Sequence, residues 1–301
     1  MTAYDIGFDI GGTKCAVILG DDDGRILSRA SFPTQALSGW REVLTRMCDE
    51  ADALLQNRAV RAVGVSCGGP LDQRRGLILS PPNLPGWDAV PVTDFIQEHM
   101  RAPAFLQNDA NACALAEWRY GAAKGTRDAI FLTFGTGLGA GLILDGRLYE
   151  GAGGLAGEVG HIRLTEDGPM GYGKHGSFEG YCTGGGLNRL AALRMGREIS
   201  AQELAERADA GDEDARRVYQ ESARMLGRGL AILIDIFNPE RIVIGSVFAR
   251  AEKYFREDME RVLQMEALPD ALKKCRIVAS ALGDRLGDVA ALAVAANGAT
   301  K

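Results

Sequence analysis

Hydrophobic positions along the chain follow two different periods. Between residues 40 and 55 apolar side chains recur every three or four residues, which predicts a helix, whereas Val60–Cys67 and Ala104–Gln107 are short β-prone runs that predict buried strands. The same criteria predict helices at Asn111–Tyr120, Gly186–Met195, Ala201–Asp209, Asp214–Phe237, Arg250–Leu263 and Gly287–Ala296, and strands at Arg241–Gly245 and Arg276–Ala279.

One pattern occurs twice. A β-rich run meets a glycine-rich turn, returns as a second strand and turns again at Asp-Gly, a pair that tolerates the positive φ of a tight hairpin. Each half therefore opens with an antiparallel meander, and the alternation of strands and helices predicts an α/β protein of two domains with the ligand in a cleft between them. The repeated strands are Tyr4–Asp9 with Ala16–Leu19, and Ala129–Phe134 with Gly141–Leu144.

Composition limits the partners of the protein. The 301 residues are 46% hydrophobic and 25% charged, with a net charge of -6 and no dense Lys/Arg patch, so neither nucleic acid nor a membrane is an expected partner. No secretory leader or membrane-spanning run is recognised, which favours a cytoplasmic location. The six cysteines are scattered, so neither a disulfide framework nor a cysteine-rich metal site is indicated.

The first glycine turn suits a phosphate group. Gly11 and Gly12 let backbone N–H groups approach an anion, Thr13 adds a donor and Lys14 adds positive charge. Asp9, at the end of the preceding strand, could hold a hydrated Mg²⁺, which prefers carboxylate and phosphate oxygens. The alternative is an ordinary hairpin turn with a solvated lysine.

The second glycine turn comes at the matching point of the second half. It contains Gly135, Thr136, Gly137 and Gly139, and with the first turn it would clamp the phosphates of a nucleotide. A P-loop carries its lysine directly after the last glycine and a dinucleotide site continues into a helix, so the turn matches neither. A hairpin without a ligand remains the alternative for one copy.

Asn108 and Asp109 lie where a predicted strand ends and an alanine-rich helix begins. A carboxylate at a strand end could accept the proton of an attacking hydroxyl during phosphoryl transfer. Both residues are also favoured helix N-caps, and capping is the competing interpretation.

Glu158, His161 and Glu179 form a third polar group among glycines. Carboxylates and imidazole can each accept from or donate to the vicinal hydroxyls of a sugar. Each of them could instead be a satisfied structural residue.

Together these motifs resemble the ROK family of repressors, uncharacterised reading frames and sugar kinases, which shares the actin and hexokinase-type (ribonuclease H-like) ATPase fold. The resemblance covers nearly the whole chain. Its motifs are the two phosphate turns, Asn108-Asp109, the long signature from Phe134 to His161, Gly68–Asp72 with Asn83–Trp87, Phe237–Gly245 and Leu282–Ala291.

The resemblance implies a glucokinase-like, ATP- and Mg²⁺-dependent sugar kinase with Asp109 as the general base. It implies a small domain of residues 1–117 plus 285–301, a large domain of residues 118–284, and a dimer or tetramer. The sugar would be held by Gly69, Asn83, Asn108, Asp109, Glu158, His161 and Glu179, and Gly245 would contact the nucleotide with Asp9, Gly11, Gly12, Thr13, Lys14, Gly135, Thr136, Gly137 and Gly139.

Two departures from the family stand out. Family members commonly bind a structural zinc through His161 and three cysteines, but Met170, Tyr172 and Ser177 stand at those positions, so we expect no structural zinc and a loop 165–177 held by packing. A substitute site from His161, His175 and Cys182 matches no standard spacing. Ser246 stands where the family often has glycine, which leaves the adenosine contact open.

Several functions remain as alternatives. Glucose is favoured because Asn83–Trp87 and the Glu158/His161 pair resemble glucokinase-type members, but N-acetylmannosamine, N-acetylglucosamine, fructose and allose use similar pockets. A ROK-type transcriptional regulator would carry a helix-turn-helix before the first turn, for which we see no room ahead of Asp9. A sugar sensor without kinase activity is disfavoured because both turns and Asp109 are present.

Overall fold

The computed structural model describes residues 4–34 and 39–300. Their packing divides the chain into two units. Unit 1 comprises Met1–Lys124, Gly151–Gly154 and Asp284–Lys301, and unit 2 comprises Gly125–Glu150 and Leu155–Gly283. Along the chain, unit 1 first gives way to unit 2 after Lys124, whereas the domain boundary expected from the sequence follows residue 117. The expected small domain also includes residues 1–3 and 301, which lie outside the described residues.

A five-stranded sheet forms the centre of unit 1, in the order β3-β2-β1-β4-β8. The first three strands form an antiparallel meander, and β4 and β8 then continue the sheet parallel to β1. The strands are β1 Tyr4–Ile10, β2 Lys14–Gly20, β3 Ile26–Pro33, β4 Val60–Cys67 and β8 Ala104–Asn108.

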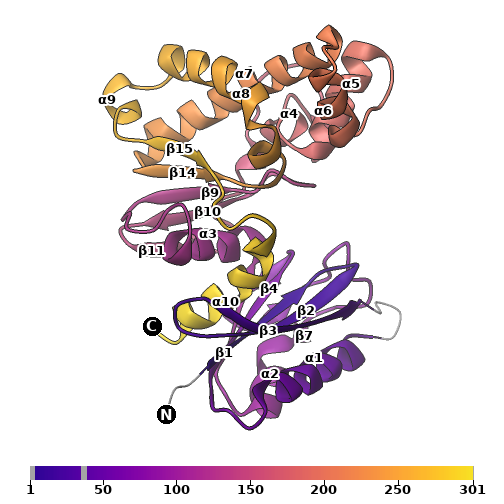
Figure 1. Cartoon of the computed structure of the whole chain (residues 1–301), viewed down its shortest axis with the longest axis vertical. Coiled ribbons are helices and arrows are strands. Elements are labelled where there is room, and N and C mark those ends of the chain that lie inside the picture. The colour runs from indigo at the N-terminus through magenta and orange to yellow at the C-terminus, as the bar shows by residue number, and fades with distance from the viewer. Residues whose placement is uncertain (1–3, 35–38, 301) are drawn as a thin grey trace. The chain divides into compact units, whose positions relative to one another are not determined.

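Helices cover both faces of this sheet. Helices α1 and α2 pack on one face, while α10 packs on the other and also contacts α3 (Figure 1). Gly64 explains how closely α10 approaches, because a Cβ there would lie 2.1 Å from the carbonyl oxygen of Ala291. The helices are α1 Trp40–Leu55, α2 Val92–Met100, α3 Asp109–Tyr120 and α10 Leu286–Gly298; a small second sheet contains β5 Leu71–Asp72, β6 Leu77–Ile78 and β7 Val90–Pro91.

Unit 2 repeats the topology of unit 1. Its sheet has the order β11-β10-β9-β14-β15, with an antiparallel meander followed by two parallel strands. The turn between β10 and β11 has positive φ at both Asp145 and Gly146, as the predicted Asp-Gly hairpin requires. The strands are β9 Ala129–Leu132, β10 Ala140–Leu144, β11 Arg147–Tyr149, β14 Arg241–Ile244 and β15 Arg276–Ala279.

Long helices carry much of the hydrophobic core of unit 2. Residues of α7 and α8 pack together and join Ile130, Leu132 and Ile242 of the sheet in one buried cluster (Figure 1). The remaining elements are η2 Val159–His161, β12 Met170–Gly171, β13 Lys174–His175, α4 Phe178–Tyr181, α5 Gly184–Met195, α6 Ala201–Asp209, α7 Glu213–Phe237, α8 Ser246–Glu266 and α9 Pro269–Leu272.

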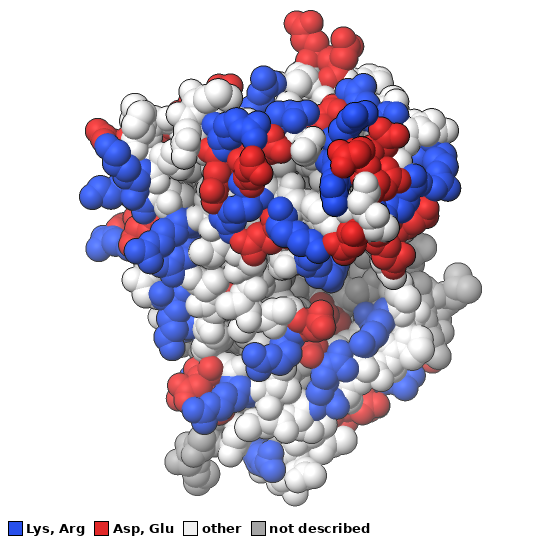
Figure 2. Space-filling view, turned by 45° about the horizontal axis from the view of Figure 1, so that its top comes forward, with Lys and Arg blue, Asp and Glu red and all other residues white. Residues whose placement is uncertain are grey.

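The predicted α/β fold class is confirmed, and the two five-stranded sheets have equivalent strand orders. Within the described residues, no helix is both long and apolar enough to cross a membrane. Acidic and basic side chains alternate over the helix-rich part of unit 2 (Figure 2), where ion pairs such as Arg194–Glu221 and Arg256–Glu252 join them.

Candidate functional site

The predicted residues of unit 1 gather where three parallel strands end. Ile10 of β1 pairs with Cys67 of β4, and Cys67 pairs with Asn108 of β8. Asp9 and Asp109 therefore lie at the same edge of the sheet. This is the edge at which open α/β sheets bind their ligands.

Asn108 and Asp109 occupy different positions at the start of α3, which bears on the two predicted roles of helix cap and proton acceptor. Asn108 is the N-cap of α3, and its Oδ1 accepts a hydrogen bond of 2.8 Å from the backbone N–H of Asn111. Asp109 is the first helical residue, and its Oδ1 accepts from the N–H of Ala110 at 2.8 Å. The capping interpretation is thus confirmed for Asn108, which leaves Asp109 free of that task.

Asp109 combines solvent access with a perturbed acidity. The residue is exposed, yet desolvation by the surrounding protein raises the pKa of its carboxyl above the ordinary value of 3.8. A carboxylate with a raised pKa is a better proton acceptor, as a general base requires.

Asp9 lies in a crowded acidic environment. Desolvation raises the pKa of its carboxyl to about 6, and the charges of Asp288 and Asp109 act in the same direction. Arg29 donates to Asp288 at 2.7 Å, and a Cβ on Gly287 would lie 3.4 Å from the Asp9 Oδ2. Sequence reasoning missed the Arg29–Asp288 pair, because its partners are distant in the chain.

The first glycine turn is packed against the predicted sugar-binding segment. A Cβ on Gly12 would lie 2.5 Å from the carbonyl oxygen of Asn83, so only glycine fits there. Asn83 itself is exposed, and its segment is held by the fully buried Leu84 and Trp87. Lys14 and Thr13 are also exposed beside this turn, and both remain available to a ligand.

Gly69 lies in the same region of unit 1. It is exposed, and a Cβ on the preceding Gly68 would lie 3.8 Å from the Asn83 Nδ2. The structure therefore brings Gly69, Asn83 and the first turn together.

Asp9 and the first turn fit a hydrated Mg²⁺ and a phosphate chain. Asp9 is partly accessible at a strand end and has a second carboxylate nearby, and the exposed Thr13 and Lys14 follow it in the turn. When bound, the metal would neutralise phosphate charge, which favours the attack of a hydroxyl on the terminal phosphorus.

The second glycine turn is held from inside by side chains. Thr133 Oγ1 accepts from the N–H of Gly139 at 2.8 Å, and Glu179 Oε2 accepts from the N–H of Leu138 at 3.0 Å. Thr133 was missed by sequence reasoning, although it precedes Gly135 by two residues as Asp9 precedes Gly11. Thr136 is exposed at the tip of the turn.

Glu158 is the N-cap residue of the short helix η2 and His161 is its last residue, and this helix lies against the same turn. The N–H of His161 donates to the carbonyl of Glu158 at 3.2 Å, and a Cβ on Gly160 would lie 2.3 Å from the carbonyl oxygen of Leu138. The structure thus places Glu179, Glu158 and His161 around the second turn of unit 2.

Gly245 lies beside the end of β9, the strand that leads into the second turn. It precedes α8, and its N–H donates to the carbonyl of Leu132 at 3.0 Å. Ser246 follows with a φ of 51°, a conformation that glycine adopts more easily, and its Oγ would be 3.7 Å from a Cβ on Gly135. The departure at Ser246 therefore places a hydroxyl beside the turn at some cost in backbone strain.

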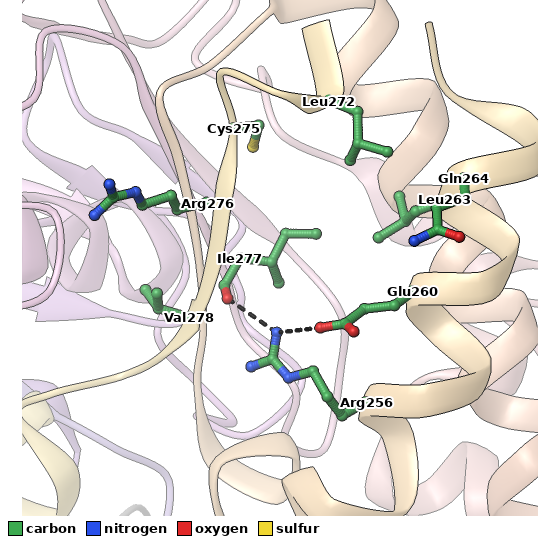
Figure 3. A pocket seen from close by; sticks show the side chains of 9 residues that line it. All are labelled: Arg256, Glu260, Leu263, Gln264, Leu272, Cys275, Arg276, Ile277 and Val278. Carbon is green, nitrogen blue, oxygen red and sulfur yellow. Dashed lines mark hydrogen bonds and ion pairs between the residues drawn. The ribbon is translucent and has the colours of Figure 1, made fainter. Parts of the chain in front are cut away.

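A separate pocket of about 420 Å³ lies between α8 and β15 of unit 2 (Figure 3). Arg256 extends into it, donates to the carbonyl of Ile277 at 3.1 Å and pairs with Glu260 at 3.4 Å. Its lining contains none of the predicted site residues, so this pocket is distinct from the candidate site.

Known proteins resemble this chain over both of its units. The sequence model of the ROK family matches residues 5–297. The glucokinase of Thermotoga maritima is 31% identical over 96% of each chain. The structure of a ROK hexokinase from Thermus thermophilus has a TM-score of 0.86 and 35% identity over 97% of each chain.

One similar protein was solved with ligands bound. A ROK family glucokinase from Streptomyces griseus, solved with glucose and AMPPNP, has a TM-score of 0.76 and 31% identity over 97% of this chain and 99% of that one. Further relatives carry other names. An N-acetylmannosamine kinase from Citrobacter koseri is 33% identical over 84% of this chain and 86% of its own, and a xylose repressor from Caldicellulosiruptor bescii is 28% identical over 93% and 75%.

Proposed function

The chain belongs to the ROK family, and on that premise we propose that it is an ATP-dependent sugar kinase that transfers the γ-phosphoryl group to a hexose hydroxyl, with glucose as the preferred acceptor. One observation carries the proposal. Asp109 is exposed, the pKa of its carboxyl is raised, and it lies at the same edge of the sheet as the first glycine turn. A sugar-binding regulator needs no such base.

Each unit contributes a different part of the chemistry. Asp109 of unit 1 accepts the proton of the attacking hydroxyl, and Asn108 and Asn83 with Gly69 border the sugar. Asp9 holds Mg²⁺ through water, and Gly11, Gly12, Thr13 and Lys14 contact phosphate oxygens.

Unit 2 binds both substrates through residues around its glycine turn. Gly135, Thr136, Gly137 and Gly139 border the phosphates, although the N–H groups of Gly135 and Gly139 are already bonded within the turn, and Gly245 contacts the adenosine side. Glu158, His161 and Glu179 bind sugar hydroxyls. Glu179 already accepts one N–H of the turn, so it couples the sugar side of unit 2 to the phosphate side.

Glucose is preferred on the evidence of relatives. The Thermotoga maritima relative is named a glucokinase, and the Streptomyces griseus enzyme was solved with glucose. N-acetylmannosamine is the second candidate, because the Citrobacter koseri relative is named for that substrate and is 33% identical. The proposal extends to a cytoplasmic homo-oligomer that binds neither nucleic acid nor membrane, with a small domain of residues 1–117 and 285–301 and a large domain of residues 118–284.

The test is kcat/KM with Mg-ATP across glucose, fructose, allose, mannose, N-acetylglucosamine and N-acetylmannosamine, followed as ADP release. We expect the highest value with glucose and a loss in the Asp109→Asn variant with every sugar. A higher kcat/KM with N-acetylmannosamine than with glucose would make N-acetylmannosamine the preferred acceptor. Sugar binding detected by calorimetry without ADP release would favour a sensor or regulator.

A further inference from the structure

The segment after His161 in unit 2 folds back on itself as a small hairpin. Strands β12 and β13 pair Met170 with His175, and Ser177 Oγ donates to the carbonyl of Gly171 at 3.2 Å. The segment closes onto η2 because the N–H of Phe178 donates to the carbonyl of Ile162 at 2.8 Å. Hydrogen bonds within the protein therefore order its backbone.

A structural zinc of the kind common in the family does not fit this segment. Met170, Tyr172 and Ser177 provide no thiolates, and the described residues contain no group of three or more His, Cys, Asp and Glu side chains that could hold a metal. The substitute considered above also fails. Cys182 is fully buried, its Sγ donates to the carbonyl of Ser222 at 3.6 Å, and burial raises the pKa of its thiol, while His175 Nδ1 lies 3.1 Å from the carbonyl oxygen of Gly168.

Tyr172 instead covers the imidazole of His161. The two rings are stacked, with centroids 4.1 Å apart and an interplanar angle of 29°. From the far side of the same turn, Lys174 Nζ donates to the carbonyl of His161 at 2.8 Å. One hairpin thus holds both the ring and the backbone of His161.

The backbone of Tyr172 indicates that its ring is needed there. Tyr172 and Gly173 form the two-residue turn between β12 and β13, and both have positive φ, 52° and 67°. Glycine suits this conformation, whereas a tyrosine adopts it only at a cost in free energy. The side chain is 61% exposed, so burial in the core does not offset that cost. Stacking on the His161 ring is a contact that offsets this cost.

We propose that Tyr172 is a positioning residue for His161, and that its ring holds the orientation of the imidazole by stacking on its face. The proposal rests on the proposed function, in which His161 binds a sugar hydroxyl. A metal would occupy one imidazole nitrogen, whereas a ring stacked on the face leaves both nitrogens for hydrogen bonds. Within the described part of the chain, neither nitrogen has a hydrogen-bond partner.

The experiment compares Tyr172→Gly with Tyr172→Phe, and uses Tyr149→Ala as a control at another exposed tyrosine of unit 2. Glycine removes the ring and relieves the strained φ, so the variant folds at least as well as the original chain. We expect its KM for the sugar to rise about 3- to 10-fold. The KM for ATP and the Tm stay unchanged, and Tyr172→Phe and Tyr149→Ala stay within about twofold of the original chain.

A second readout does not depend on activity. The chain has three histidines, so the ring protons of His161 can be assigned by NMR with a His161→Gln variant. Loss of the tyrosine ring current shifts these protons in Tyr172→Gly but not in Tyr172→Phe. If the original chain phosphorylates no sugar, the proposed function fails, while this comparison still tests the stack.

Four results would overturn the proposal. They are an unchanged sugar KM in Tyr172→Gly, an equal rise in the KM for ATP, unshifted His161 protons, and about one zinc per chain in purified protein by elemental analysis.

Discussion

The two glycine turns occupy equivalent places in sheets of the same strand order, yet they are built differently. Two residues before the first glycine, unit 1 has the carboxylate of Asp9 and unit 2 has the hydroxyl of Thr133. Asp9 lies among other charges, whereas Thr133 Oγ1 is used inside its own turn. The same topology therefore carries a charged turn in unit 1 and a turn shaped by an internal hydrogen bond in unit 2.

The ends of the last parallel strands show the same contrast. Strand β8 leads to Asn108 and Asp109, a cap and a candidate base, while β15 leads to Ala279 and Ser280, which have no ionisable group. A repeat detected in sequence thus locates two equivalent sheet edges, but only side chains distinguish the edge that carries the proposed base.

Asp109→Asn tests the proton chemistry of unit 1 and should have the largest effect. We expect kcat to fall about 10²- to 10⁴-fold, because an amide cannot accept the proton. Since desolvation raises the pKa of Asp109, kcat of the original chain should fall with decreasing pH at an apparent pKa above 3.8. Near-normal kcat in steady-state assays of the variant would remove Asp109 from the role of base.

Gly12→Ala and Gly135→Ala compare the packing of the two turns. A Cβ added at position 12 would lie 2.5 Å from a backbone oxygen of Asn83, whereas at position 135 the nearest atom is the Ser246 Oγ at 3.7 Å. By denaturant unfolding we expect Gly12→Ala to lose about 1–3 kcal/mol, and Gly135→Ala to stay within about 0.5 kcal/mol. Equal losses would show that the turns are packed alike.

Thr133→Val tests whether the second turn depends on its internal hydrogen bond. Valine keeps the shape but leaves the N–H of Gly139 without the acceptor at 2.8 Å. The loss of one hydrogen bond is worth about 0.5–1.5 kcal/mol, so the KM for ATP should rise about 3- to 10-fold. Thr133→Ser, which keeps the hydroxyl, serves as the control and should behave as the original chain.

Asp9→Asn should have the smallest effect when stability is measured without Mg²⁺ or nucleotide. The pKa of Asp9 is about 6 in the folded chain and 3.8 ordinarily, so folding binds the proton more tightly. The carboxyl therefore lowers stability as pH rises from 3.8 to about 6, and the full cost persists at higher pH.

Thermal unfolding of Asp9→Asn should accordingly show a pH-dependent gain. We expect about 1 kcal/mol at pH 7.5, after allowance for the water that reaches the partly accessible group, and no gain near pH 3. Asp94→Asn on α2 is the exposed control. A gain that is equal at both pH values would show that the burial of charge at Asp9 is unimportant.

Much of the fold follows from local patterns in the sequence. The bounds of α1, β4, α6 and β15 agree with the predictions, because each element has a clear period and a distinct end. Helix α3 begins at Asp109 rather than Asn111, since the Asn108 side chain caps it. The two-residue strands β5 to β7 were not predicted, because two residues define no period.

The site was predictable where its chemistry is local and not where it depends on tertiary contacts. Glycine turns and strand-end acids can be recognised in the sequence. The Arg29–Asp288 pair joins residues 259 positions apart, and Tyr172 contacts His161 only because a hairpin turns the chain back. Neither pair has a local signal.

Helix α10 has a consequence for the order in which the protein is made. It lies directly on β1 at Gly7 and on β4 at Gly64, yet it is synthesised after all of unit 2. Because domains fold as their sequences emerge, one face of the first sheet waits uncovered while the whole of unit 2 is translated. The surroundings of Asp9, which include Gly287 and Asp288, are therefore complete only after unit 2 has been synthesised.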